Sequence, residues 1–239
     1  MIATARPIPA RDRLIVALDL PTVADAGAMV ARIGPAAGFY KIGLQLLFAG
    51  GLDLVRRLTG EGHRVFIDAK FLDIPETVRK AVESVARLGA TFLTVHADPK
   101  TCRAAIAGRG DAPLKLLFVT VLTSVEEADL RAGGVTRPLA DLVLDRVDQV
   151  LEAGGDGVVA AGAEAAAIRA RAGDRLVIVT PGIRPAGAAA QDQKRIATPA
   201  GAIAAGADHL VVGRPITEAA DPRAAAEAIV REIEATRAA

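Results

Sequence analysis

Eight short apolar runs, each followed by an amphipathic stretch, constrain this chain more than any other feature of its sequence. Most of the runs are nearly continuous in apolar residues, as strands covered on both faces of a parallel sheet should be. Strict alternation of such strands with helices predicts repeated βα units, and eight units close into a (β/α)8 TIM barrel. The expected strands are Leu14–Leu20, Phe39–Leu44, Arg64–Lys70, Thr91–Ala97, Lys115–Leu122, Gly157–Ala161, Leu176–Pro181 and His209–Gly213.

A doubly wound open sheet is the alternative that the same alternation allows. Such a sheet normally carries a glycine-rich dinucleotide loop after its first strand, and the segment Asp19-Leu20-Pro21-Thr22 is not such a loop. A chain of 239 residues also lies in the range in which an α/β barrel forms one domain. We therefore expect a single barrel domain over residues 13–239, preceded by a poorly ordered leader over residues 1–12.

Local helix and loop signals fall between the expected strands. Thr22 and Asp25 resemble a capping box before a helix over Ala26–Ile33. The pair Arg137-Pro138 interrupts the stretch between the fifth and sixth strands, which predicts more than one helix there. The segment Gly182–Arg195 is rich in Gly, Ala and Pro and follows the seventh strand, so we expect a lid over the C-terminal end of the barrel.

Composition restricts the partners that the chain can have. Its 29 basic and 28 acidic residues leave a net charge of +1, so no overall field favours nucleic acid or an anionic membrane. Aromatic residues make up only 3% of the chain, and no apolar run approaches the roughly 18 residues that cross a bilayer. Cys102 is the only cysteine, and the first residues lack the apolar core of a signal peptide. We expect a cytoplasmic protein with no nucleic-acid or membrane partner.

Charged residues break otherwise apolar runs at the expected strand ends. Asp19 ends the first run, Lys41 lies within the second, and Asp68 and Lys70 end the third. A buried charge costs several kcal/mol unless it is paired. Side chains two residues apart point to the same face of a strand, so Asp68 and Lys70 should face the barrel interior at its mouth. Barrel mouths carry active sites, which favours a catalytic centre over ion pairs that merely close the barrel.

His96 ends the fourth expected strand, where an imidazole could act in catalysis or bind a metal. The other histidines, His63 and His209, fall near strand starts at the opposite end of the barrel. No second ligand stands at metal spacing from His96. We therefore interpret His96 as a hydrogen-bonded structural residue and expect no metal site.

The segment Asp68-x-Lys70-x-x-Asp73-Ile74-Pro75-x-Thr77 resembles the signature of the orotidine 5′-phosphate decarboxylase family. One such motif alone is weak, but further blocks similar to those of the family follow in family order on the matching strand ends. After His96, the sequence departs from the family, because Asp98-Pro99-Lys100 stands where small residues and glycines are usual. The matching blocks lie within residues 13–223 and are Ala17-Leu18-Asp19, Lys41-Ile42-Gly43, Val119-Thr120-Val121-Leu122-Thr123-Ser124, Thr180-Pro181-Gly182-Ile183-Arg184 and Val212-Gly213-Arg214-Pro215-Ile216.

This resemblance implies an enzyme that converts orotidine 5′-phosphate to UMP and carbon dioxide, the last step of de novo pyrimidine nucleotide synthesis, without a cofactor. By family position, Lys70 is the general acid that protonates C6 of the pyrimidine. It would lie between Asp68 of its own chain and Asp73 of a second chain, in an alternating-charge array that includes Lys41. The resemblance thus implies a homodimer with shared active sites.

The other site residues are also implied by family position, and they form three sets that contact the ribose, the pyrimidine and the phosphate. The phosphate contacts have a separate rationale, because barrels often bind phosphate with the loops after strands seven and eight. Asp19 and Lys41 would contact the ribose, together with Asp73 and Thr77 of the second chain; Thr123 would contact the pyrimidine; Arg184, Gln193 and the backbone of Gly213 and Arg214 would hold the phosphate.

Two other functions remain open at this point. A sugar-phosphate enzyme of the same superfamily, such as a ketogulonate-phosphate decarboxylase or a hexulose-phosphate synthase, shares the core motif but uses its acidic groups around Mg²⁺ to stabilise an enediolate. The continuation Ile74-Pro75-x-Thr77, together with Thr123 and Gln193, favours the pyrimidine enzyme. A catalytically silent phosphate-binding barrel would require a reacting residue to be missing, and none is.

Overall fold

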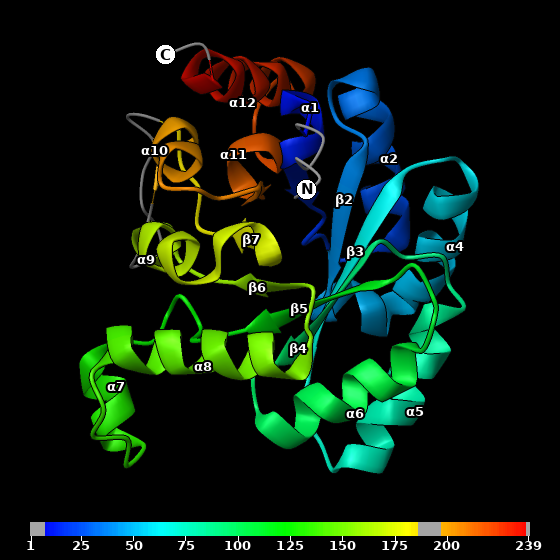
Figure 1. Ribbon diagram of the computed structural model, residues 1–239. Coiled ribbons are helices and arrows are strands. Elements are labelled where there is room, and N and C mark those ends of the chain that lie inside the picture. The colour runs from blue at the N-terminus through cyan, green and yellow to red at the C-terminus, as the bar shows by residue number, and fades with distance from the viewer. Residues whose placement is uncertain (1–7, 186–196, 238–239) are drawn as a thin grey trace, which may run out of the picture.

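Eight parallel strands close into a barrel in the computed structural model, which describes residues 8–185 and 197–237 (Figure 1). Each strand pairs with the next along the chain, and the last strand pairs with the first. The predicted (β/α)8 barrel is confirmed, and the open doubly wound sheet is excluded. The strands are β1 Leu14–Ala17, β2 Phe39–Gly43, β3 Arg64–Phe71, β4 Phe92–His96, β5 Lys115–Val119, β6 Gly157–Val159, β7 Val177–Thr180 and β8 His209–Val212.

Helices surround the strands, as the amphipathic stretches of the sequence predict (Figure 1). Thr22 caps α2, because its hydroxyl oxygen accepts a hydrogen bond from the Asp25 amide at 3.1 Å. The division predicted at Arg137-Pro138 is confirmed, since α7 ends before this pair and α8 begins after it. None of the described helices is long and apolar enough to span a membrane. The helices are α1 Ala10–Arg13, α2 Val23–Ile33, α3 Leu44–Leu46, α4 Leu52–Gly60, α5 Pro75–Ala86, α6 Pro99–Arg109, α7 Glu127–Ala132, α8 Leu139–Ala153, α9 Gly162–Ala172, α10 Pro199–Ala204, α11 Arg214–Thr217 and α12 Pro222–Arg237, with shorter turns η1 Gly34–Ala36, η2 Leu47–Gly51 and η3 Gly173–Arg175.

Most strands end earlier at the mouth of the barrel than the apolar runs predict. β1 ends at Ala17, so Asp19 lies beyond the strand rather than at its last position. The intervening Leu18 is completely buried, and its amide still donates to the Lys41 carbonyl at 2.9 Å. Hydrophobic burial therefore continues past the end of the regular ladder, and for this reason an apolar run overestimates the length of the strand.

Aromatic rings fill the barrel interior at its N-terminal end. The rings of Phe39, Phe92 and His209 pack there with centroids between 5.1 and 5.8 Å apart. Burial, reinforced by the charge of Arg64, lowers the pKa of His209 to about 3, so the imidazole is neutral. Its Nδ1–H donates to the Asp12 carbonyl at 3.0 Å. The prediction that His209 lies at a strand start, at the end of the barrel opposite Asp68 and Lys70, is confirmed.

The first described residues enter the barrel from this same end. Ala10 in α1 is buried, and Asp12 forms an ion pair with Arg64 at 2.7 Å. Arg13 donates to the Ala207 carbonyl at 3.2 Å. Residues 10–12 of the expected leader are therefore helical and packed against the barrel, whereas residues 1–7 lie outside the described residues.

Candidate active site

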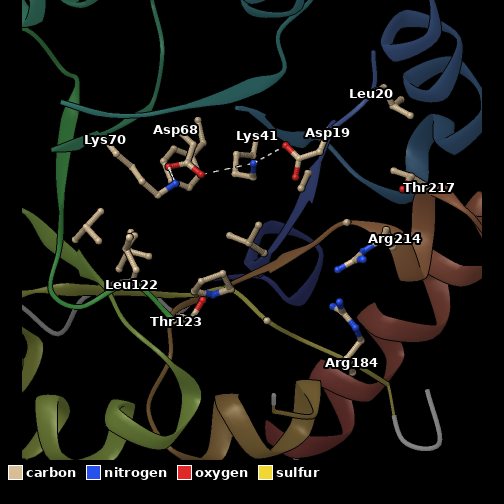
Figure 2. A pocket seen from close by; sticks show the side chains of 18 of the residues that line it. Asp19, Leu20, Lys41, Asp68, Lys70, Leu122, Thr123, Arg184, Arg214 and Thr217 are labelled. Atoms are coloured by element: carbon tan, nitrogen blue, oxygen red, sulfur yellow. Dashed lines mark hydrogen bonds and ion pairs between the residues drawn. The ribbon is translucent and has the colours of Figure 1, made fainter. Parts of the chain in front are cut away.

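A cavity of about 540 Å³ opens at the C-terminal end of the barrel, and this volume suits a small-molecule ligand. Its wall combines apolar side chains of the barrel interior with charged side chains from strand ends and the loops that follow them (Figure 2). The fold thus brings together residues that lie far apart in the sequence. The predicted site residues that line the cavity are Asp19, Lys41, Asp68, Lys70, Thr123, Arg184, Gly213 and Arg214.

Four charged side chains form a row of alternating sign along one wall of the cavity (Figure 2). Lys41 Nζ lies 2.8 Å from Asp19 Oδ1 and 3.5 Å from Asp68 Oδ2. Lys70 Nζ lies 2.7 Å from Asp68 Oδ1, which confirms that Asp68 and Lys70 face the same side. Lys41 and Asp68 are buried, so these two charges are stabilised mainly by their neighbours rather than by water.

Asp68 stays ionised although it is buried. Burial alone would raise its pKa, but the charges of Lys41 and Lys70 and the hydrogen bonds from Lys70 and Thr94 hold that pKa below its ordinary value. The Thr94 hydroxyl donates to Asp68 Oδ1 at 2.8 Å and accepts a hydrogen bond from the Lys70 amide at 3.0 Å. Sequence reasoning missed Thr94, because a β-branched residue inside an apolar run already fits an ordinary strand.

Lys70 has a backbone conformation that ordinary strand residues avoid. Its φ angle is +49°, the one positive φ among the non-glycine residues that the structure describes. The pairing of β3 with β4 shifts register between Ile67 and Phe71, so the chain is irregular at this point. A left-handed residue with a side chain costs roughly 1–2 kcal/mol. Such strain persists where the surroundings fix the conformation, as they commonly do at functional sites.

Two arginines line the cavity away from Lys70, and their guanidinium groups face one another (Figure 2). Arg184 is only 6% exposed, and its Nε has no hydrogen-bond partner among the described residues. Burial, followed by the positive charge of Arg214, lowers the pKa of Arg184, and the negative charge of Glu218 opposes this shift. A buried donor without a partner beside a second cation favours an anion as the ligand of this corner.

The loops after β7 and β8 meet at this corner of the cavity. Gly213, which follows β8, lines the cavity beside the two arginines. Of the expected lid Gly182–Arg195, residues 182–185 are described, and Gly182 also lines the cavity. Gln193 lies outside the described residues, so its predicted phosphate contact stays a prediction.

A family model described as Orotidine 5′-phosphate decarboxylase / HUMPS family matches residues 12–229. The chain belongs to the orotidine 5′-phosphate decarboxylase / HUMPS family. The match contains all eight strands and every loop that contributes to the cavity. The family predicted from the ordered sequence motifs is therefore confirmed.

Relatives that bear the decarboxylase name cover nearly the whole chain. The orotidine 5′-phosphate decarboxylase of Rhodopseudomonas palustris strain BisA53 is 60% identical over 227 residues, which are 95% of this chain and 97% of the relative. That of Methylorubrum populi is 60% identical over 224 residues, 94% of this chain and 96% of the relative. The crystal structure of orotidine 5′-phosphate decarboxylase from Lactobacillus acidophilus has a TM-score of 0.81 at 38% identity, and the superposition covers 92% of this chain and 98% of that one.

Two residues of the family signature do not line the cavity of their own chain. Asp73 and Thr77 are both exposed, and the Asp73 carboxylate accepts a hydrogen bond from the Ile74 amide at 2.6 Å. Leu72 and Ile74, on either side of Asp73, are 61% and 68% exposed. Within one chain of this family member, the structure therefore separates Asp73 and Thr77 from the other predicted site residues.

His96 and the loop after it lie beside the site rather than in it. His96 ends β4, and burial, followed by the charges of Arg146 and Lys70, lowers its pKa. Its imidazole makes no hydrogen bond within the described residues, so the expected hydrogen-bonded role is not supported. Asp98, where the sequence departs from the family pattern, accepts a hydrogen bond from the Thr101 amide at 3.0 Å and starts α6.

Proposed function

We propose that the protein decarboxylates orotidine 5′-phosphate to UMP and carbon dioxide, the last step of de novo pyrimidine nucleotide synthesis. The observation that carries this proposal is the Lys70 ammonium, held 2.7 Å from Asp68 in a cavity that also contains a pair of arginines. The ammonium at one end of the cavity and the two arginines at the other suit a substrate that carries a carboxylated ring and a phosphate. The relatives at 60% identity bear the name of this enzyme.

Lys70 is the proton donor in this proposal. When the bond between C6 and the carboxylate breaks, the electron pair stays on C6 as a vinyl carbanion that the pyrimidine delocalises poorly. The Lys70 ammonium stabilises this developing charge and then transfers a proton from Nζ to C6, which forms the C6–H bond of UMP. The resulting amine regains its proton from water before the next turnover.

The other charged residues of the row hold Lys70 ready for this step. Asp68 fixes the ammonium at 2.7 Å, and Lys41 keeps Asp68 ionised from its other oxygen at 3.5 Å. Such an array is organised before the substrate arrives, so little reorganisation is needed in the transition state.

The remaining cavity residues are proposed to bind different parts of the nucleotide. Asp19 and Lys41, paired at 2.8 Å on the wall beside the reacting groups, are proposed to hydrogen-bond the ribose hydroxyls. Thr123, in the loop after β5, is proposed to contact the pyrimidine. Arg184, Arg214 and the backbone of Gly213 are proposed to bind the phosphate, and Gln193 is proposed as a further phosphate contact.

The purified protein should consume orotidine 5′-phosphate, and EDTA should leave the rate unchanged. Asp19 and Asp68 are each already bound to the Lys41 ammonium, which competes with any cation for the same oxygens. The measurement is the loss of substrate absorbance with and without chelator. A magnesium-dependent sugar-phosphate enzyme would behave differently: complete loss of its own activity in EDTA, restored by Mg²⁺, would favour that rival.

We also propose that two chains form a homodimer with shared active sites. Asp73 and Thr77 are exposed in the single chain, and a second chain could receive them at its own Lys70. The two residues on either side of Asp73 are apolar and exposed, as residues at the centre of an interface between copies should be. These residues are Leu72 and Ile74, and the chain also exposes Phe48 in η2 at 90% and Leu52 in α4 at 42%.

Mixing two inactive variants should restore activity if the sites are shared. In a hybrid of an Asp73→Ala chain with a Lys70→Ala chain, one site receives both intact residues and the other receives neither. If half of the dimers are hybrids, about a quarter of the wild-type sites are recovered. Activity is measured after mixing, with subunit exchange shown independently by a tagged chain. No recovery despite proven exchange would contradict shared sites.

The cytoplasm is the proposed location, because nucleotide synthesis supplies the substrate there. A small-molecule nucleotide is the proposed partner of the cavity. Cys102 is buried, and burial raises the pKa of its thiol to about 12, which suits a reduced, unreactive cysteine.

A further inference from the structure

The arginine corner of the cavity contains an acidic side chain for which the decarboxylation has no evident use. Glu218 follows α11 directly, and it lines the cavity together with Arg184 and Arg214. Its amide donates to the Arg214 carbonyl at 3.0 Å, so its backbone is fixed to the turn that carries this arginine. A carboxylate at a corner that favours anions opposes the binding of a phosphate.

We infer that Glu218 is a specificity-determining residue that limits the affinity of the site for the 5′-phosphate of its nucleotide ligands. The inference rests on the proposed function for the identity of the nucleotide. It concerns the strength with which a phosphate is held and the rate at which the product is released, and the reacting groups at Lys70 are not involved.

In the empty site, Glu218 offsets the repulsion between two cations. Arg184 is buried beside Arg214, and the carboxylate stabilises its charged form, as the direction of its contribution to the Arg184 pKa shows. When a phosphate dianion enters, it supplies that negative charge itself. Glu218, an exposed residue that lines the same cavity, then repels this like charge, so part of the attraction from the arginines is cancelled.

This weakening has a use in turnover. Interactions with the phosphate are present in the substrate, the transition state and UMP alike, so tighter phosphate binding raises the affinity for product as much as for substrate. The same site without the Glu218 charge would hold UMP longer. Glu218 therefore favours release of the product while leaving both arginines available for the transition state.

The test compares Glu218→Gln with the wild-type protein, because glutamine keeps the size of the side chain and removes its charge. Titration calorimetry with UMP and with inorganic phosphate should show about fivefold tighter binding to the variant at low ionic strength. The difference should shrink in about 0.5 M salt, because the Debye length then falls to roughly 4 Å and the charge of Glu218 is screened. Uridine, which has no phosphate, should bind both proteins equally.

A matched control is Glu234→Gln, which removes the same charge from an exposed position of α12 outside the cavity. It should bind UMP and phosphate like the wild type. The thermal midpoint of Glu218→Gln without ligand should fall, since the variant lacks a negative charge that stabilises the charged form of Arg184. Lower stability together with tighter phosphate binding is the combination that a merely structural glutamate would not produce.

Equal or weaker binding of both UMP and phosphate by Glu218→Gln would overturn the inference. Tighter binding of uridine as well would also overturn it, because the effect would then not be confined to the phosphate. The proposed function is judged separately, by turnover of orotidine 5′-phosphate in the wild type. If that turnover is absent, the decarboxylase proposal fails, while the comparison with inorganic phosphate still decides the role of Glu218.

Discussion

Replacing Lys70 with alanine is expected to lower kcat by about 10⁵-fold while UMP binding stays measurable. A positioned general acid contributes roughly 10²–10⁴-fold, and a charge aimed at a developing anion contributes roughly 10²–10³-fold. In the proposed mechanism, Lys70 combines both roles at one atom, and its Nζ lies in the cavity 2.7 Å from Asp68. The measurement is the decarboxylation rate at saturating substrate, with UMP binding followed by calorimetry.

The binding measurement separates a chemical defect from a folding defect. Asp68 keeps its contacts to Lys41 and Thr94 in this variant, so the buried carboxylate is still compensated. Lys115→Ala is the matched control, because Lys115 is exposed at the first position of β5, at the opposite end of the barrel. It should retain wild-type activity. Full activity in Lys70→Ala would remove Lys70 from the mechanism.

Arg184→Ala is expected to lower kcat/KM for orotidine 5′-phosphate by about 100-fold, or about 3 kcal/mol of transition-state stabilisation. Arg184 is buried with an Nε that has no partner among the described residues, so a phosphate oxygen would complete its hydrogen bonds. Steady-state kinetics at substrate concentrations far below KM give this ratio directly. An unchanged kcat/KM would remove Arg184 from the phosphate site.

The nucleoside orotidine, which lacks the phosphate, provides the control for this variant. Its slow decarboxylation should have the same kcat/KM in Arg184→Ala and in the wild type, because the lost contact is absent from both reactions. A decrease for orotidine as large as that for the nucleotide would show that the substitution damages the barrel instead. Arg184→Lys should fall between the two, since lysine keeps the charge but loses the planar pair of donors.

The sequence was sufficient to predict the barrel and most of the charged cavity, for a physical reason. Strands covered on both faces must be apolar, so a charge inside such a run stands out. Lys41, Asp68 and Lys70 stand out in this way, and the structure brings them into contact. Asp19 stands out too, although it lies past the end of β1, because burial extends beyond the regular strand.

Other features depend on neighbours that a linear pattern does not reveal. Thr94 matters because β4 lies beside β3, and its hydroxyl then meets Asp68. The positive φ of Lys70 arises from a register shift between those strands. Glu218 lies far from Arg184 in the sequence, and only the fold brings both residues to the same cavity. The roles proposed for Asp73 and Thr77 depend on a second chain, which the sequence of one chain does not place.

The packed rings of Phe39, Phe92 and His209 close the barrel at its N-terminal end, so that the cavity is open only at the C-terminal end. A nucleotide cannot pass through these rings, so ligands enter and leave at the C-terminal end. UMP must leave the cavity before the next orotidine 5′-phosphate can bind, and carbon dioxide leaves by the same opening. Substrate and products therefore share one entrance, and release of UMP must precede binding of the next substrate.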